Sequence, residues 1–470
     1  MKNADLLARS LAAVWHPCTQ MKQHETLPLI PIARGEGVWL YDFDGKRYLD
    51  AVSSWWVNLF GHANPRINAA LKDQLDQLEH VMLAGFTHEP VVELSERLAK
   101  LTGLGHAFYG SDGASATEIA LKMSFHYWRN SGQPQKTNFI SLQNSYHGET
   151  IGALSVTDVA LFKDTYAPLL RQSTQVPSPD WRLAEPGESA KAYALRCAKA
   201  LETHLQQHHT TTAALIVEPL VQGAAGMAMY HPAYFKRARE LCDQYQIHLI
   251  ADEIAVGFGR TGTMFACEQA FGSPPPPAPP PLAGEGSRSP SPASGGGAGE
   301  RANVSERVTP DFICLSKGIT GGYLPLSVVL TTDAVYAAFY DDQTTRGFLH
   351  SHSYTGNALA CRAALATLDI FEQDDVIVVN RAKAARFNQL LAPLAAHAKV
   401  RNFRHLGMIW AFEVASANPQ FARDFTQSAL AAGLLLRPIG NTVYLMPPYV
   451  IGEAEMALLA EQLLQLVEQA

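Results

Sequence analysis

The chain has little that would place it in a membrane or on a nucleic acid. Its 470 residues contain no apolar run close to the roughly 20 residues that cross a bilayer. Lysine and arginine number 37 against 44 aspartates and glutamates, a net charge of −7, and no basic block stands out. This balance excludes the footprint of a nucleic-acid-binding protein. Asp5 and Arg9 interrupt the first apolar stretch, so we expect no secretory signal.

Cysteine is also scarce, and its spacing excludes two common uses. The chain has no C-x-x-C pair; its six cysteines stand at positions 18, 197, 242, 267, 314 and 361. We therefore expect reduced thiols in a cytoplasmic protein, with neither a disulfide framework nor a zinc site. His204 and His208 are four residues apart on a predicted helix, but no third ligand is evident, which favours a solvated helix face over a metal site.

One region lacks large apolar side chains almost entirely. Residues 272–308 carry nine of the 28 prolines together with many glycines and serines. Such a segment cannot bury enough surface to offset its ordering entropy, so we predict a disordered surface insert. An inert insertion is the simpler interpretation, and a proline-rich ligand for an SH3-like partner is the alternative.

The remaining sequence alternates short apolar strands with longer helical stretches from about residue 106, which predicts an α/β fold with a mainly parallel sheet. The expected strands cover 106–110, 137–143, 213–220, 247–254, 312–316 and 326–332. The pattern of predicted helices and strands changes near residue 374, where a smaller α+β domain is expected. A hairpin with its turn at Asp44 and Gly45 is expected to join that domain. The predicted organisation is 1–52 in the small domain, 53–373 as the large domain and 374–470 completing the small one.

Polar residues follow the predicted strands, where ligands bind in open α/β sheets. Asp252 ends one strand and Lys317 follows another. A lysine amine can form an imine with pyridoxal phosphate (PLP), and a carboxylate against the pyridine nitrogen keeps the ring protonated and electron-withdrawing. Neither residue is diagnostic alone, but together they indicate a PLP site.

The segment 109–122 predicts a strand, a turn and a helix start that would bind a phosphate. Gly113 and Ala114 would contact it through backbone amides, with Ser115 as an additional donor; the alternative is a helix capped by Ser111 or Asp112. The motif 350–361 offers a second phosphate contact through its polar residues Ser351, His352 and Ser353.

Aromatic and charged residues elsewhere suit a substrate site. Tyr146 and His147 follow another strand, where an aromatic ring would stack on the cofactor; a structural aromatic corner is the alternative. Trp55 would pack on an aliphatic substrate, or fill the core with Trp56. Arg437 would clamp a carboxylate, or form a surface salt bridge.

Two further residues have open roles. Glu218 would bond near the cofactor or support a catalytic neighbour, and Arg260 would meet a substrate carboxylate or pair with an acid. Arg260 lies in "GFGRTG", which also matches the dinucleotide motif G-x-G-x-x-G. The acidic pair Asp252 and Glu253 at the strand end would repel a pyrophosphate, so we reject that interpretation.

Taken together, these motifs resemble the class III (ornithine/4-aminobutyrate type) PLP-dependent aminotransferases over the whole chain except 272–308. The resemblance implies a PLP-dependent transferase of fold type I. Within the family, "WHPCTQM", "DAVSSWW", "YHGET" and "RPIGNTVYLMPPY" are most similar to members that use S-adenosylmethionine to aminate 8-amino-7-oxononanoate in biotin biosynthesis.

The resemblance also implies roles for individual residues. Lys317 is the imine-forming lysine and proton shuttle, Asp252 pairs with the ring nitrogen, and Tyr146 stacks on the ring and touches substrate. Gly113 and Ala114 bind the phosphate, which His352 and Ser353 reach from the neighbouring subunit of an obligatory homodimer. Trp55, Arg437 and the main chain of Ser351 contact substrate.

The chain departs from the family pattern at four positions. Cys18 stands where better-known members carry a tyrosine near the substrate amine, so the pose or affinity of the donor is in question. Ala114 and Ser353 replace serine and threonine, and Ser351 replaces a glycine. Three alternatives therefore stay open: an ω-amino acid or ornithine aminotransferase, an aminomutase of the same fold, and lysine in place of adenosylmethionine as the donor.

Overall fold

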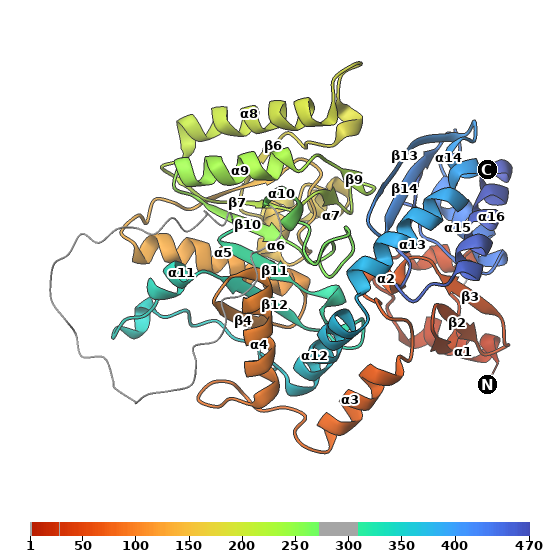
Figure 1. Cartoon of the computed structure of the whole chain (residues 1–470), viewed down its shortest axis with the longest axis horizontal. Coiled ribbons are helices and arrows are strands. Elements are labelled where there is room, and N and C mark those ends of the chain that lie inside the picture. The colour runs from red at the N-terminus through yellow and green to blue at the C-terminus, as the bar shows by residue number, and fades with distance from the viewer. Residues whose placement is uncertain (1, 28, 272–308) are drawn as a thin grey trace.

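The described part of the chain centres on a seven-stranded sheet (Figure 1). The structure, a computed structural model, describes residues 2–27, 29–271 and 309–470, so the predicted insert at 272–308 lies outside the described residues. The strands are, in spatial order, β4 (His106–Gly110), β12 (Ser327–Thr331), β11 (Phe312–Leu315), β10 (His248–Asp252), β7 (Thr212–Val217), β5 (Asn138–Leu142) and β6 (Thr174–Val176).

Six of these strands run in one direction and one runs against them. β11, β10, β7, β5 and β6 pair in parallel, whereas β12 pairs antiparallel with both β11 and β4. The reversal at β12 returns β4 to the common direction. The predicted α/β class with a mainly parallel sheet is therefore confirmed, with one antiparallel strand that the sequence rhythm did not indicate.

Helices cover both faces of this sheet, which explains why its strands are apolar throughout rather than alternating. Along β7, Ala214 and Ile216 pack in one cluster with α5 (Gly113–Asn130), while Leu215 and Val217 pack in the other. The second face is covered by α8 (Ala190–His208) and α9 (Ala233–Gln244), which lie above the sheet in Figure 1. α12 (Ala358–Gln373) packs against α3 (Pro65–Leu75) and α4 (Glu89–Thr102).

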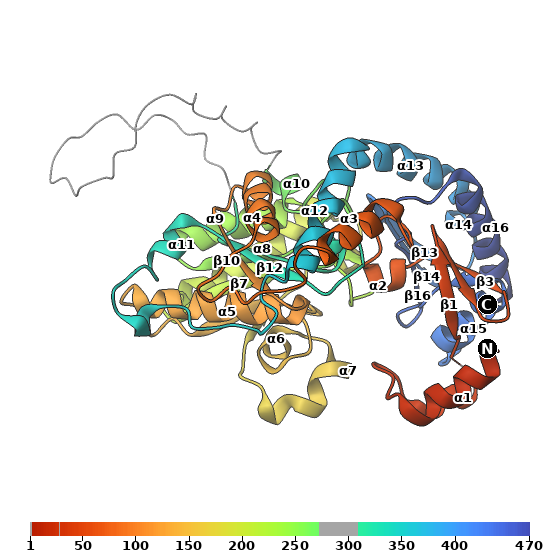
Figure 2. The ribbon, with the colours of Figure 1, turned by 90° about the horizontal axis from the view of Figure 1, so that it is seen from below.

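Two smaller sheets lie beside the large one (Figure 2). One combines β1 (Ile32–Glu36), β2 (Trp39–Asp42) and β3 (Arg47–Asp50) with β15 (Leu434–Leu435), so the N-terminal hairpin pairs with a strand from near the C-terminus. The other consists of β13 (Val400–Leu406), β14 (Ile409–Val414) and β16 (Thr442–Leu445). The hairpin with its turn at Asp44 and Gly45 is confirmed. The exact domain boundaries at 52 and 373 stay a prediction.

The remaining elements connect these layers. The helices that pack by the small sheets are α13 (Val376–Leu390), α14 (Ala392–Ala395), α15 (Phe421–Ala431) and α16 (Glu453–Gln469). The other elements are α1 (Asn3–Ala13), α2 (Ser53–Trp56), α6 (Ile151–Val156), α7 (Ala160–Lys163), α10 (Glu268–Phe271), α11 (Asp333–Ala337), β8 (Val221–Gln222) and β9 (Ala228–Met229). Among the described residues, no helix combines the length and apolar character that a bilayer crossing needs.

Candidate active site

The candidate residues gather where the strands of the large sheet end. Because β4, β5, β7, β10 and β11 share one direction, their carboxyl ends meet at one edge. Asp252 is the last residue of β10, and Lys317 follows β11 by two residues. Tyr146 and Glu218 follow β5 and β7. The sheet therefore brings together residues that are up to 171 positions apart in the sequence (317 − 146).

Lys317 has the electrostatics of an amine prepared for nucleophilic attack. Burial lowers the pKa of Lys317 to about 8, although the carboxylates of Asp252 and Glu218 act in the opposite direction. Its Nζ lies 4.3 Å from the centre of the Trp56 ring. Lys317 also has a positive φ of 46°, a conformation that non-glycine residues adopt mainly where surrounding structure holds them. A perturbed lysine at a strand end indicates function more than it indicates packing.

Asp252 is held by His147, a residue to which the sequence motifs assigned no specific role. The Asp252 side chain is buried, and its Oδ2 lies 2.7 Å from Nδ1 of His147, which is also buried. Oδ1 accepts a hydrogen bond from the backbone N–H of Ile254. Two separate contacts thus fix the direction of the carboxylate. Its position two residues after the "HLI" core of β10 was the only signal in the sequence.

Glu218 and Glu149 support Tyr146 from two sides. Glu218 Oε1 accepts from the backbone N–H of Tyr146 at 3.0 Å, and Oε2 accepts from that of Gly223. Burial raises the pKa of Glu218 to about 7, with His147 opposing and Asp252 adding to the rise. The Tyr146 hydroxyl donates to Glu149 at 2.9 Å. Burial and the Glu149 carboxylate raise the pKa of Tyr146, so its phenol keeps its proton at neutral pH. Glu218 thus contacts its protein neighbours, as one of its two predicted roles requires, and the role near the cofactor stays a prediction.

The start of α5 offers backbone amides at the same edge of the sheet. Asp112 caps the helix through the backbone N–H and hydroxyl of Ser115, at 2.9 and 3.0 Å. The first intrahelical bond comes from Ala116, so the amides of Gly113 and Ala114 precede the helical ladder and can meet an anion. A Cβ on Gly148 would lie 2.6 Å from the Cβ of Ala114, so the two segments approach closely only because Gly148 has no side chain.

The segment that carries Ser351, His352 and Ser353 lies beside this helix start in the same chain. Nδ1 of His352 is 3.1 Å from the hydroxyl of Ser111, and the carbonyl of Ser353 lies 2.9 Å from Nε2 of His80. Ser351 is exposed. Their predicted reach into a neighbouring subunit stays a prediction, because the structure places a single chain.

Trp55 and Trp56 project from a left-handed turn that follows β3, in the small sheet formed by β1, β2, β3 and β15. The four residues Ser53 to Trp56 have φ values of 51°, 46°, 72° and 73°. Each residue in this conformation costs about 1–2 kcal/mol, so an unsupported chain would not adopt it. Trp56 is buried against Lys317 and Tyr444, whereas Trp55 is 45% exposed. The sequence predicted Trp55 at the substrate site but gave no sign of this backbone.

Arg437 and Cys18 lie together with Trp55. The guanidinium carbon of Arg437 is 4.7 Å from the centre of the Trp55 ring, and its Nη2 donates to the carbonyl of Cys18 at 3.4 Å. Arg437 and Cys18 are both exposed. The predicted salt-bridge alternative for Arg437 is not what the structure shows; its described contacts are an aromatic face and a carbonyl. An exposed cation beside an aromatic face suits a ligand with both a carboxylate and an aliphatic chain.

Arg260 is buried and donates to backbone carbonyls of two separate segments. It is 1% exposed, and its Nη atoms donate to the carbonyls of Pro447 and Asn58 at 2.9 and 3.1 Å and, more weakly, to those of Met446 and Trp56. Its guanidinium lies 4.9 Å from the ring centre of Tyr449. These bonds link the left-handed turn to the segment after β16. Of the two roles expected from sequence, an ion pair with a nearby acid is not seen among the described residues, and contact with a substrate carboxylate stays a prediction.

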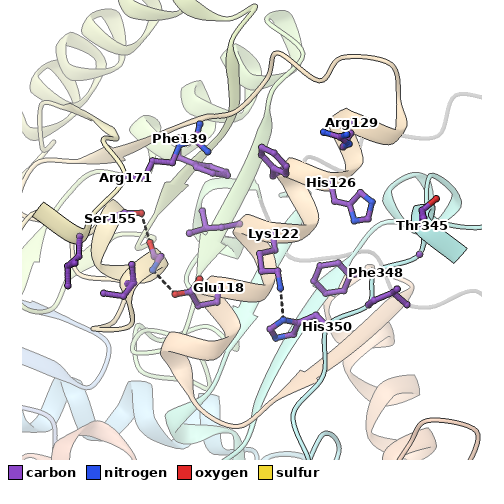
Figure 3. A pocket seen from close by; sticks show the side chains of 17 residues that line it. Glu118, Lys122, His126, Arg129, Phe139, Ser155, Arg171, Thr345, Phe348 and His350 are labelled. Atoms are coloured by element: carbon purple, nitrogen blue, oxygen red, sulfur yellow. Dashed lines mark hydrogen bonds between the residues drawn. The ribbon is translucent and has the colours of Figure 1, made fainter. Parts of the chain in front are cut away.

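A separate pocket lies along α5 (Figure 3). Its volume is about 750 Å³, and it is bounded by α5, by α6 and by residues 345–350. Lys122 meets His350 there at 2.8 Å, and Glu118 caps the start of α6 by accepting from the backbone N–H of Gly152 (Figure 3). None of Lys317, Asp252 and Tyr146 is among its lining residues, so this pocket is distinct from the candidate site.

The strand-end residues fit PLP. Lys317 supplies an amine of lowered pKa, and Asp252 is a fixed carboxylate within its electrostatic reach. Tyr146 supplies an aromatic ring, and the start of α5 supplies amides for a phosphate. These four features match an aldehyde, a pyridine nitrogen, a ring face and a phosphate group, which are the parts of PLP that a protein must hold.

Comparison with known proteins gives a consistent result. The family described as "Aminotransferase class-III" matches residues 20–276 and 296–467. An adenosylmethionine-8-amino-7-oxononanoate aminotransferase of Helicobacter pylori is 45% identical, with 99% of this chain and 98% of that protein covered. The protein of the same name in Geobacter sulfurreducens is 38% identical, with 96% of this chain and 94% of that protein covered.

Solved structures agree with the sequence comparisons. The crystal structure of an adenosylmethionine-8-amino-7-oxononanoate aminotransferase from Methanocaldococcus jannaschii has a TM-score of 0.86 and 33% identity, with 99% of each chain covered. An omega transaminase of Pseudomonas jessenii in complex with PMP has a TM-score of 0.87 and 27% identity, covering 99% of this chain and 98% of that one. The chain therefore belongs to the class III aminotransferases, and its cofactor is pyridoxal phosphate.

Proposed function

We propose that this enzyme transfers the amino group of S-adenosylmethionine to 8-amino-7-oxononanoate, which yields 7,8-diaminononanoate for biotin biosynthesis. The observation that carries the proposal is the 45% identity over 99% of the chain with a relative of that name. The exposed pair of Trp55 and Arg437 supports it independently, because an oxononanoate has a long aliphatic chain that ends in a carboxylate.

Each residue of the site has a distinct task in this reaction. Bound PLP supplies an aldehyde that condenses with amines and a ring that withdraws electrons from the reacting carbon. Asp252, oriented by His147, would hold the pyridine nitrogen, and Tyr146 would cover one face of the ring. The amides of Gly113 and Ala114 would hold the phosphate. The Lys317 amine becomes free to act on the substrate once the donor's amine has taken its place on the cofactor.

Lys317 moves the proton. With a pKa of about 8, a useful fraction of its Nζ is neutral near pH 7.5 and can take the proton from the amine-bearing carbon of the donor. The Trp56 ring beside Nζ stabilises the cation that results, so the proton is held until it is returned. Arg437 and Trp55 would meanwhile fix the far end of the oxononanoate.

A donor screen tests this proposal. Purified enzyme with 8-amino-7-oxononanoate as acceptor should form 7,8-diaminononanoate with S-adenosylmethionine, and the deaminated oxo-product of the donor should be released in equal amount. Lysine, ornithine and ω-amino acids serve as parallel arms. Turnover with lysine but not with S-adenosylmethionine would change the donor, and turnover of ornithine with a 2-oxo acid in place of the oxononanoate would change the acceptor. Release of an oxo-product from the donor would exclude an aminomutase.

We also infer that the active form is a homodimer with shared sites. Large apolar side chains are exposed around the segment that carries His352 and Ser353: Leu349 is 78% exposed, Tyr354 66%, Phe86 57% and Met82 56%. Leu349 also lines the pocket of Figure 3. A second copy of the chain would bury these side chains, which an isolated monomer leaves in water.

Subunit mixing tests whether the sites are shared. A Lys317→Ala subunit and a subunit with His352→Ala and Ser353→Ala should each be impaired, and random mixing should restore about a quarter of wild-type activity through mixed dimers. Recovery fails if each chain supplies its own phosphate contacts, an arrangement compatible with the bond between His352 and Ser111 within one chain. We further propose the cytoplasm as the compartment, because all six cysteines are free thiols.

A further inference from the structure

The backbone from Ser53 to Trp56 is held in a conformation that its own residues do not favour. None of the four is a glycine or asparagine, yet all have φ between 46° and 73°. The backbone N–H groups of Trp56 and Val57 donate to the carbonyls of Val52 and Ser53, which closes a left-handed turn. Serine and tryptophan enter this region only when other contacts impose it. Those contacts must therefore be found outside the turn.

Asp50 supplies the most direct of these contacts. It is the last residue of β3, and its side chain is fully buried. Oδ1 accepts from the backbone N–H of Ser54 at 2.9 Å, and Oδ2 accepts from the hydroxyl of the same residue at 2.7 Å. Oδ1 also lies 3.4 Å from the backbone nitrogen of Val52. One carboxylate thus holds both the backbone and the side chain of the second residue of the turn.

His62 fixes the carboxylate in turn. Its Nε2 lies 3.1 Å from Oδ2 of Asp50, and its Nδ1 lies 3.1 Å from Nδ2 of Asn58. The backbone of His62 pairs with that of Gly37 through two hydrogen bonds, which attaches it to the hairpin of β1 and β2. Asp50 is therefore anchored both by its own strand and by a histidine that is tied to the neighbouring turn of the same sheet.

The opposite side of the turn is tied to the segment after β16. The Ser53 hydroxyl donates to the carbonyl of Met446 at 2.6 Å, and buried Arg260 donates to the carbonyls of Trp56 and Asn58. Those bonds fix where the turn lies, but they do not touch the backbone of Ser54 or Trp55. Asp50 alone, among the described side chains, bonds the N–H in the middle of the turn.

The turn directs two adjacent indoles at two cations of the site. Trp56 lies over Nζ of Lys317, and Trp55 lies under the guanidinium of Arg437. In an extended strand two consecutive side chains point to opposite faces. In this tight turn the angle between the side chains of Trp55 and Trp56 is smaller, so both can face the site. Trp56 fits only because its neighbour Gly223 has no side chain; a Cβ there would lie 2.9 Å from the indole. A relaxed backbone would move both rings at once.

We propose that Asp50 is a positioning residue for catalysis: by holding the left-handed turn, it sets Trp55 against Arg437 and Trp56 against Lys317 together. Its kinetic consequence rests on the proposed function, since the acceptor carboxylate is what Arg437 and Trp55 would bind. Its structural consequence does not depend on any substrate. The inference thus predicts that one buried aspartate, which contacts neither substrate nor cofactor, couples binding of the acceptor to the proton transfer of Lys317.

Asp50→Ala tests the proposal, with Asp42→Ala as the matched control. Asp42 is also buried and also holds a turn, through the backbone N–H groups of Asp44 and Lys46, but that turn is the distal end of the β2–β3 hairpin. Displacing reacting groups by about 1 Å can cost on the order of 100-fold, so Asp50→Ala should lower kcat/KM for the acceptor by about 100-fold, with a raised KM. Asp42→Ala should keep the wild-type KM.

A second readout needs no turnover. The tryptophan bands in the near-ultraviolet circular dichroism of the cofactor-free protein should change in Asp50→Ala and not in Asp42→Ala, where the altered contact is to Tyr48. The change should vanish when Trp55 and Trp56 are both replaced by phenylalanine. If the wild-type enzyme does not aminate the oxononanoate, the proposed function fails while this spectrum still decides the role of Asp50.

Two milder variants separate positioning from stability. Asp50→Asn keeps an oxygen that accepts from the Ser54 N–H. His62 can then bond the new amide at position 50 through its other tautomer, because the Asn58 amide, whose Oδ1 has no hydrogen-bond partner among the described residues, can rotate to match it. This variant should stay within about tenfold of wild type. Ser54→Ala deletes only the hydroxyl bond and should raise the acceptor KM to a smaller extent. The proposal is overturned if Asp50→Ala has the same acceptor KM and the same spectrum as Asp42→Ala. If Asp50→Ala does not fold, Ser54→Ala takes its place in this comparison.

Discussion

The two halves of the active site are built on different kinds of backbone. Asp252 ends one strand of the large sheet, and Lys317 and Tyr146 follow two others. Buried His147 holds Asp252, buried Glu218 holds the backbone N–H of Tyr146, and the charges of Asp252 and Glu218 act on Lys317. Trp55, Arg437 and Cys18 lie on irregular segments, are exposed, and are positioned by a strained turn and carbonyl bonds. In the proposed reaction, the chemical steps thus use residues on the regular sheet, while recognition of the substrate uses segments that can change without altering the fold.

The largest expected effect comes from the sheet half. Lys317→Ala should lower turnover by at least about 10⁴-fold, because the variant loses both the imine-forming amine and the proton shuttle. The visible absorbance of the cofactor-bound enzyme should disappear with it. An unchanged spectrum would mean that another lysine carries the cofactor, and the division between the two halves would have to be redrawn.

Asp252→Asn should have the next largest effect. We expect turnover to fall by roughly 100- to 1000-fold while the cofactor still binds, because one preorganised charge is lost without a change of shape. Equilibrium titration with PLP and single-turnover kinetics measure the two quantities separately. If the variant keeps wild-type turnover, then the His147–Asp252 pair is a structural contact.

Arg437→Ala probes the recognition half. Loss of a charged hydrogen-bonding partner for the acceptor should raise its KM by about 10- to 100-fold. The KM for the amino donor should change much less, and kcat should stay near its wild-type value. Steady-state kinetics with each substrate varied in turn provide the measurement, and equal effects on both substrates would assign Arg437 to a shared role.

The pH dependence of cofactor capture sharpens the assignment of Lys317. The neutral amine is the reactive form, so the capture rate of cofactor-free enzyme should rise about tenfold per pH unit below pH 8 and level off above it. Asp252 raises the pKa of Lys317, so the Asp252→Asn variant should reach its plateau at a lower pH. Stopped-flow absorbance across pH 6 to 10 measures both curves; a shift to higher pH in the variant would contradict the electrostatic account.

The smallest effect is expected from a region outside both halves. Deletion of residues 274–300 should leave turnover within about twofold of wild type, because loop closure depends only weakly on length. The deletion includes residues 277–295, which the class III family does not match. A loss of activity or of the dimer would show that this insert contributes to one of the two halves.

The sheet half was predictable from sequence for a physical reason. Apolar strands that end in an acid or a lysine reveal both their burial and their direction, so Asp252, Lys317 and Tyr146 could be assigned to one edge before any contact was known. The reversed strand β12 was not indicated, because a buried apolar run reads the same in either direction.

The residues of the recognition half could be predicted from the sequence, but their arrangement could not. "SSWW" indicated an aromatic site, but nothing in two serines and two tryptophans signals a left-handed backbone. The turn depends on Asp50 and on His62, twelve residues further along the chain, and the link through Arg260 joins segments far apart in the sequence. Such contacts arise from tertiary packing, which no local pattern records. Asp50, three residues before "SSWW", was the one available signal.

The distribution of thiols offers a practical handle. All six cysteines lie in the described ranges; five are buried, and Cys18, whose carbonyl meets Arg437, is exposed. A maleimide dye should therefore attach to the native enzyme at one place, beside the residues proposed to bind the acceptor. Its emission would report when the acceptor binds there, without the need to engineer a labelling position.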